Sequence, residues 1–229
     1  MLEKTKTKPT TAKKPEKPAA PVTPITKVVI TPPNFAHATV RIVGTAPYVQ
    51  NRMSQHSITK MVETQKEGTL QKRGKRKRPP KDFEAAYKGA MHIAAGANWY
   101  GIPCSAIRAA MISACRTVDF AMTRAKLFLF VEPDGFDSVD RQPLIRLEGE
   151  PREFMMAVRL ASGTTDIASR PMFEEWSANV RLKWDADALS TTDIVNLLSR
   201  AGVHVGIGAG RPDSRESSGM GFGTFEIDA

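Results

Sequence analysis

The sequence predicts an α+β fold with a ferredoxin-like core. Some segments alternate apolar and polar residues as half-buried strands do, and others repeat apolar residues at helical spacing. Laid end to end, the main predicted elements run strand, helix, strand, strand, helix, strand. This doubled order is typical of a ferredoxin-like sheet.

The first half of this core begins at residue 37. His37–Gly44 alternates and is rich in β-branched residues, which predicts a strand that Pro47 ends. A helix is predicted over 105–118, where apolar residues recur every three or four positions. The apolar run Lys126–Val131 then predicts a buried strand.

The second half begins with the most regular strand of the chain, Trp176–Trp184, whose apolar residues share one face. A helix with Ser190 as its N-cap follows to about residue 201, and Gly202 is predicted to end it. Val203–Ile207 is predicted to be a short extended segment, and Phe222–Ile227 the last strand.

A tail and two insertions are predicted around this core. Residues 1–36 hold seven prolines with lysine and threonine between them, which predicts a disordered basic tail. Residues 37–229 are expected to form a single domain. Its core is interrupted at about 47–102 and at about 132–172.

Each insertion is predicted to contain its own elements. The first holds helices over 54–65, with a serine as N-cap, and over 82–88. Between them, residues 67–81 form a basic loop that contains glycine and proline and is too charged to pack. The second insertion is predicted to hold a hairpin of strands 144–147 and 155–160.

The net charge of +9 is concentrated in two short segments. Residues 1–36 carry seven lysines and two glutamates, and residues 72–81 carry seven basic residues and no acidic one. The combined net charge of these two segments exceeds that of the whole chain by three, so the remaining residues carry a slightly negative net charge. Two compact basic segments favour a polyanionic partner such as nucleic acid.

Composition excludes several classes of protein. Two cysteines are too few for a disulfide-stapled secreted scaffold or a four-cysteine zinc module. In one helix, Cys104 and Cys115 would lie about 16 Å apart along the axis. That is too far for a disulfide, so both are predicted to be core residues.

Membrane insertion and secretion are not expected. No apolar run approaches the roughly 20 residues that a membrane span needs, and the basic N-terminus lacks the apolar run of a secretory signal. A reducing cytoplasm is the expected location, either bacterial or that of a phage host. No cofactor and no metal are predicted.

The most informative segment is glycine-rich and spans Gly206–Phe225. Such glycines let the backbone approach a phosphate chain closely and present N–H donors, and Arg211 and Arg215 lie among them. No Gly-Lys-Ser/Thr follows, so the segment is not a P-loop. Pro212 and a following strand exclude a dinucleotide-binding turn. The alternative interpretation is a mobile surface loop.

A second segment, Gly101–Met111 (GIPCSAIRAAM), helps to interpret the glycine-rich segment. Together the two segments resemble the RAMP superfamily, the RNA-binding proteins of CRISPR effector complexes. Members of that family carry an Ile-Pro-Gly-Ser-Ser-hydrophobic-Lys-Gly type helix start and a glycine-rich loop before the last strand. The positions that match are Ile102, Pro103, Ser105, Ile107 and Arg108, whereas those that depart, as in a distant relative, are Cys104, Ala106 and Ala109.

The opening strand and its turn (VRIVGTAPYVQ) also resemble that family, which extends the resemblance over roughly residues 37–229. Among members of that family, the resemblance is closest to the subunits that coat a guide RNA. The resemblance implies an RRM-like core, single-stranded RNA held along one face, and self-association or a multisubunit complex along the strand. Stand-alone relatives encoded by phages would look the same.

The predicted nucleic-acid-binding residues on strands are Arg41, Arg181 and Lys183. For the last two, the alternative interpretation is that they belong to a solvated strand face with no binding role. Arg108 lies near a helix start, where N–H groups favour phosphate. The full set is Arg41, Lys72, Arg73, Lys75, Arg76, Lys77, Arg78, Arg108, Arg181, Lys183, Gly208, Gly210, Arg211, Arg215, Gly219 and Gly221.

Aromatic side chains supply the stacking platforms that single-stranded nucleic acid prefers. Tyr48, Trp99 and Tyr100 are the candidates outside the predicted core. Trp176 and Trp184 are predicted to lie in the core.

Other functions stay open. His56 is the candidate general base of a metal-independent endoribonuclease, and a surface histidine is the alternative. Asp134, Asp137 and Asp140 lack the pattern of a calcium loop, so an acidic turn is predicted. The remaining alternatives are a phage protein that coats or anneals single-stranded DNA, and an inhibitor that imitates a CRISPR subunit.

Overall fold

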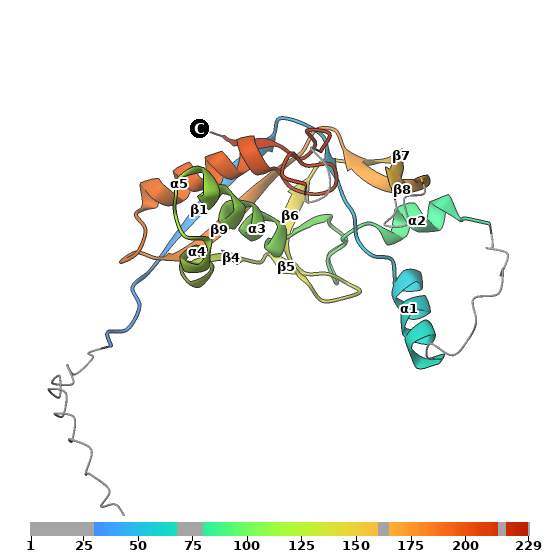
Figure 1. Ribbon diagram of the computed structural model, residues 1–229, viewed down its shortest axis with the longest axis horizontal. Coiled ribbons are helices and arrows are strands. Elements are labelled where there is room, and N and C mark those ends of the chain that lie inside the picture. Colours follow the sequence, from blue (N-terminus) through green and yellow to red (C-terminus); the bar gives the residue numbers. More distant parts are fainter. Residues whose placement is uncertain (1–29, 68–79, 160–164, 215–218, 229) are drawn as a thin grey trace, which may run out of the picture. The chain divides into compact units, whose positions relative to one another are not determined.

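A computed structural model describes residues 30–67, 80–159, 165–214 and 219–228. Within the unit Pro33–Ala229, helices pack with two antiparallel sheets, which confirms the α+β class (Figure 1). The predicted tail, apart from residues 30–36, lies outside the described residues. The first strand takes up the last two residues assigned to that tail, because it begins at Phe35.

The larger sheet has the strand order β10-β1-β9-β6-β3. A further strand, β4, pairs with β9 on the side away from β1, and β5 pairs with β6. The strands are β1 (Phe35–Gly44), β3 (Gly101–Pro103), β4 (Leu129–Glu132), β5 (Gly135–Phe136), β6 (Pro143–Glu148), β9 (Ser177–Asp185) and β10 (Phe225–Ile227).

The register of β1 and β9 follows from their alternating residues. Pairs run from Phe35 opposite Asp185 to Val43 opposite Ser177. This register places Ile42, Val180 and other apolar side chains on one buried face, and the polar side chains together with Phe35 on the open face. The two strands predicted with most regular alternation are thus neighbours at the centre of the sheet.

Two helices, α3 (Cys104–Ala114) and α5 (Thr191–Arg200), cover the buried face. Ser190 caps α5, as the sequence predicts, and it forms a reciprocal capping box with Asp193. A short 3₁₀ turn, η1 (Cys115–Thr117), continues α3. Trp176 and Trp184 lie in the core, and both cysteines are buried and free, in agreement with prediction.

The two insertions come together in a second, smaller sheet with the order β2-β8-β7. Its strands are β2 (Tyr48–Val49) from the first insertion, and β7 (Pro151–Arg159) and β8 (Thr165–Phe173) from the second. Helix α2 (Phe83–Gly89) packs against β8, whereas α1 (Gln55–Glu67) has no extensive packing partner among the described elements (Figure 1).

Three predicted elements need correction. The end of helix α4 (Met122–Phe128) takes up the first residues of the strand predicted over Lys126–Val131, so only its last part is strand. The segments 144–147 and 155–160 do not pair with each other, because the first joins the large sheet and the second pairs with β8. Strand β8 itself was not predicted.

The helix ending near Gly202 also differs from the prediction. The chain continues as a π-helical turn, η2 (Ala201–Val205), where an extended segment was predicted, and the turn ends at Gly206 with φ 68°. Gly202 serves packing instead, since a Cβ there would lie 2.1 Å from the carbonyl oxygen of Phe225.

Candidate nucleic-acid interface

The open face of the large sheet carries three predicted binding residues, and each has a partner. Arg41 pairs with Glu148 at 2.8 Å and with Asp228 at 3.3 Å, which raises the pKa of its guanidinium. Arg181 pairs with Asp134 at 3.1 Å. The ammonium of Lys183 lies 4.3 Å from the centre of the Phe35 ring. Carboxylates therefore pair with both of the predicted arginines on this face.

The glycine-rich segment is built as two facing runs of backbone. Six of its glycines have φ between 67° and 77°, a region that favours glycine: Gly206, Gly208, Gly210, Gly219, Gly221 and Gly223. The N–H of Ile207 donates to the carbonyl of Gly223 at 2.9 Å, and the N–H of Gly223 donates to that of Pro47 at 2.8 Å. These contacts hold the described part of the segment in a defined shape.

A hollow with a volume of about 1020 Å³ lies beside this segment, and we call it the loop groove. Its walls are the start of α3, residues 208–211 and 219–220, residues 51–53, and parts of β7 and β8 at residues 156–158 and 170. A second hollow of about 590 Å³ adjoins it and shares Ser105 and Arg211 with it. The two form one path along the glycine-rich segment.

The loop groove brings together two arginines that have no carboxylate within ion-pair distance among the described contacts. Arg170 and Arg211 both line it, and the charge of Arg211 contributes to lowering the pKa of Asp213. Arg211 donates to the carbonyl of Gly208 at 3.1 Å, and burial lowers the pKa of Arg170. The start of α3 forms one wall of this groove, and its backbone N–H groups have no capping side chain.

A buried polar cluster forms the base of the groove. Asp137, which is fully buried, lies 3.0 Å from Nδ1 of His92 and 3.3 Å from the guanidinium of Arg52. Asp140 approaches the same guanidinium at 3.6 Å, and Gln50 accepts the backbone N–H of His92. The cluster ties the two insertions together, and His92, Arg52 and Asp140 line the groove.

The folded state is expected to become less stable as the pH falls, because burial lowers the pKa of His92. Asp137 acts in the opposite direction on this pKa, but the effect of burial is larger. The unfolded histidine takes up a proton below about pH 6.5, whereas the folded one stays neutral to a lower pH. Stability from this group is therefore complete above that pH and lost below it. Urea unfolding of the wild type and of His92→Gln measures the effect; equal pH slopes in the two proteins would contradict it.

The remaining predicted site residues differ in where they lie relative to the loop groove. Arg108 adjoins the groove but donates to the carbonyls of Lys126 and Leu129, so it also ties α3 to α4 and β4. Gly208, Gly210 and Gly219 line the groove, and Gly221 does not. Residues 72–78 and Arg215 lie outside the described residues, as does the side chain of His56, which belongs to α1.

The stacking candidates need one correction. Tyr48 is buried, with its ring centre 5.5 Å from that of Trp176 and 6.1 Å from that of Phe173, so it is a core residue. Tyr100 is half-buried and its ring centre lies 5.5 Å from that of Phe173. Trp99 is half-buried beside Asp134 on the sheet side, away from the loop groove.

Sequence reasoning missed Arg52, Arg170 and His92. The predicted acidic turn is instead partly buried, because Asp137 and Asp140 both face Arg52. The only sequence signal for this cluster was the pair of aspartates three residues apart. Their basic partners lie far away along the chain and in no recognisable motif.

No group of three or more metal-binding side chains is placed to hold an ion within the described ranges. None of the described helices combines the length and apolar character that crossing a lipid bilayer requires. No protein-family model matches the chain, and no curated protein sequence matches it.

Proposed function

We propose that the chain binds single-stranded nucleic acid in the loop groove and coats it as a row of copies. One observation carries this proposal. The loop groove is lined by glycine backbone, by the uncapped start of α3, and by the cations Arg170 and Arg211. Phosphates need such donors, and single strands need a continuous path rather than a closed pocket.

The choice of RNA over DNA follows from the resemblance of Gly101–Met111 and the glycine-rich segment to the RAMP superfamily. The strand order β10-β1-β9-β4, with α3 and α5 on one face, supports a ferredoxin-like, RRM-like core of the kind that this family has. In this account the basic residues 72–78 add affinity and salt dependence without specificity.

The loop groove is expected to account for more of the binding than the sheet face. Arg170→Gln with Arg211→Gln should weaken binding of a uridine oligonucleotide and lower the slope of log affinity against log salt by about 1.4, or about 0.7 per lost phosphate contact. Arg41→Gln with Arg181→Gln removes the same charge from the sheet face and is the matched control. Fluorescence anisotropy at several salt concentrations measures both.

The control pair is expected to bind nearly as the wild type does, because carboxylates already neutralise those two arginines. The proposal fails if the sheet-face pair loses more affinity than the groove pair, or if both keep the wild-type salt slope. A thymidine oligonucleotide of the same length, used as competitor, measures the preference for RNA.

A metal-independent endoribonuclease is the second candidate function, and His92 favours it. Its Nδ1 faces the buried Asp137, which fixes the ring as in a catalytic dyad, and the ring lines the groove. Incubation of end-labelled RNA with EDTA distinguishes the two functions. Intact RNA supports binding alone, whereas cleavage to cyclic phosphate ends that His92→Gln abolishes supports the enzyme.

A further inference from the structure

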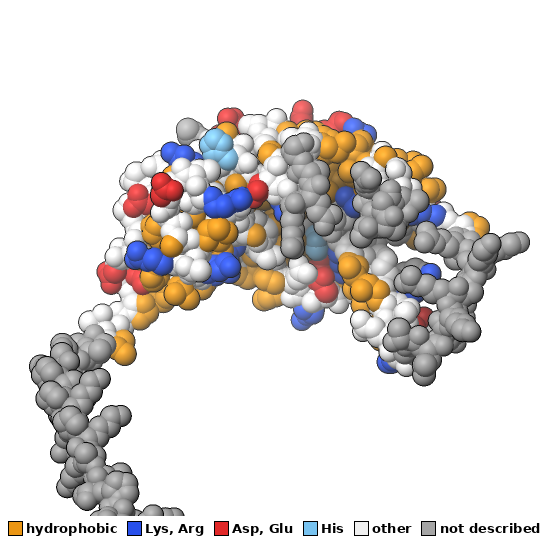
Figure 2. Space-filling model, viewed as in Figure 1, with side chains coloured by type: hydrophobic (Ala, Val, Ile, Leu, Met, Phe, Trp, Pro, Cys, Tyr) orange, Lys and Arg blue, Asp and Glu red, His pale blue; other side chains and the backbone are white. Residues whose placement is uncertain are grey.

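The groups of the loop groove that can contact phosphate do not distinguish RNA from DNA. Arg170, Arg211 and the backbone N–H groups at the start of α3 are donors that suit the phosphates of either nucleic acid. Acidic and basic side chains are interspersed among the described residues in Figure 2, so individually placed groups matter more than bulk charge. A choice between RNA and DNA needs a group that contacts the sugar.

The ring of His92 presents a hydrogen-bond acceptor. Its Nδ1 lies 3.0 Å from one carboxylate oxygen of Asp137. The other oxygen of Asp137 accepts the backbone N–H of Val139 at 2.8 Å and lies 3.3 Å from the guanidinium of Arg52. An ionised carboxylate only accepts hydrogen bonds, so the proton of a neutral imidazole here is on Nδ1. Nε2 then carries a lone pair.

Nε2 of His92 is open to the loop groove, which the ring lines. No described residue forms a hydrogen bond with Nε2. This atom is not fully buried, since the buried side-chain polar atoms without a partner among the described residues belong to Arg52 and Arg181. The side chain of His92 is only 8% exposed, and burial favours its neutral form by lowering its pKa. The groove therefore holds a fixed lone pair that needs a donor.

We propose that Nε2 of His92 accepts a hydrogen bond from a ribose 2′-hydroxyl, which makes His92 the residue that selects RNA over DNA. The 2′-hydroxyl is the donor that DNA lacks. When a ligand without this hydroxyl binds, the buried acceptor is left unpaired, and that lowers affinity. The inference rests on the proposed binding in the loop groove and deepens it, and no bond is broken in this contact.

Three oligonucleotides of equal length and base sequence test this contact. They contain uridine, 2′-deoxyuridine or 2′-fluoro-2′-deoxyuridine, and the fluorine keeps an RNA-like sugar pucker without a hydroxyl proton. Fluorescence anisotropy should give the wild type an affinity for the uridine oligonucleotide about 2- to 10-fold higher than for either of the others, as one hydrogen bond provides. Equal affinities in the wild type overturn the inference without any variant.

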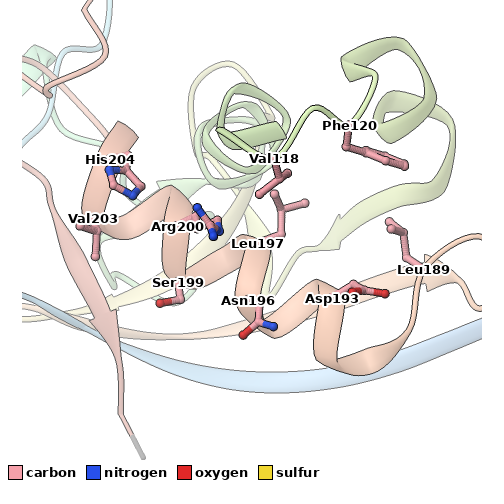
Figure 3. A pocket seen from close by; sticks show the side chains of 10 residues that line it. All are labelled: Val118, Phe120, Leu189, Asp193, Asn196, Leu197, Ser199, Arg200, Val203 and His204. Atoms are coloured by element: carbon pink, nitrogen blue, oxygen red, sulfur yellow. The ribbon is translucent and has the colours of Figure 1, made fainter. Parts of the chain in front are cut away.

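His92→Asn is expected to remove the preference for RNA. The amide of asparagine reaches the place of Nδ1 and can still donate to Asp137, but it has no atom at the place of Nε2. Its affinity for the deoxyuridine oligonucleotide should stay near that of the wild type, which reports an intact groove. His204→Asn is the matched control and should keep the preference, because His204 lines a hollow along α5 that shares no residue with the loop groove (Figure 3).

The outcomes separate this inference from the proposed function. A preference for RNA that His92→Asn keeps, or that His204→Asn also loses, overturns the inference and leaves nucleic-acid binding in place. Loss of binding to all three oligonucleotides by His92→Asn also counts against it, because the contact concerns RNA alone. A wild type that binds none of the three overturns the proposed function, and the inference with it.

Discussion

Replacing Asp137 with alanine is expected to lower the free energy of unfolding by about 3–5 kcal/mol, the cost of breaking a buried ion pair from one side. Asp137 is fully buried, accepts the N–H of Val139 at 2.8 Å, and faces both Arg52 and His92. Without it, the guanidinium of Arg52, whose side chain is 7% exposed, keeps Asp140 at 3.6 Å as a carboxylate partner and donates to the carbonyl of Met91 at 3.1 Å. Two nitrogens of Arg52 already lack a hydrogen bond within the described residues.

Asp140→Ala is the matched control for this prediction. Asp140 approaches the same guanidinium from a position that is 26% exposed, so its loss should cost about 1 kcal/mol or less. Urea unfolding of the three proteins at about pH 7 gives the comparison. If Asp137→Ala is no less stable than Asp140→Ala, the cluster does not hold the insertions together.

Gly223→Ala is expected to destabilise the chain by about 1–3 kcal/mol more than Gly221→Ala, because it adds overpacking to backbone strain. Both glycines have positive φ, of 67° and 77° respectively, so either alanine incurs the left-handed backbone cost of roughly 1–2 kcal/mol. At Gly221 a new Cβ meets nothing within 4 Å, whereas at Gly223 it would lie 1.9 Å from the carbonyl oxygen of Ile207.

The same pair of variants also tests what the glycine-rich segment does. Gly223→Ala should force its two runs apart and weaken oligonucleotide binding, whereas Gly221→Ala should bind as the wild type does at a temperature where both are folded. Urea unfolding and anisotropy measure the two effects. Equal stability of the variants would mean that the facing runs are not packed as described.

The fold was predictable where one face of an element is buried. β9 alternates strictly and β1 alternates over most of its length, because their inner residues meet α3 and α5, and Ser190 marks the start of α5 by its capping chemistry. Strand β8 escaped prediction because it contains Pro171, a residue that argues against a middle strand, and because its apolar residues cluster at one end.

The candidate site was predictable only in part. The alternate glycines and Arg211 stand close together in the sequence, so their pattern was visible. The ion pairs were not, because Arg41 and Glu148 lie 107 residues apart and Asp137 lies 45 residues from His92. Sequence shows which residues are charged, whereas neutralisation depends on the tertiary fold, and this shifts the proposed interface from the sheet face to the loop groove.

Photo-cross-linking of a thiouridine-labelled oligonucleotide, followed by mass spectrometry of the peptides, shows directly whether single-stranded nucleic acid lies in the loop groove. Adducts are expected on the walls of the groove, at Met156, Met220 and residues 208–211. Phe35 and Phe130, which pack edge to face at 6.2 Å on the sheet, should remain unmodified. Adducts confined to those two rings and their neighbours, with none in the loop groove, would contradict binding in this groove.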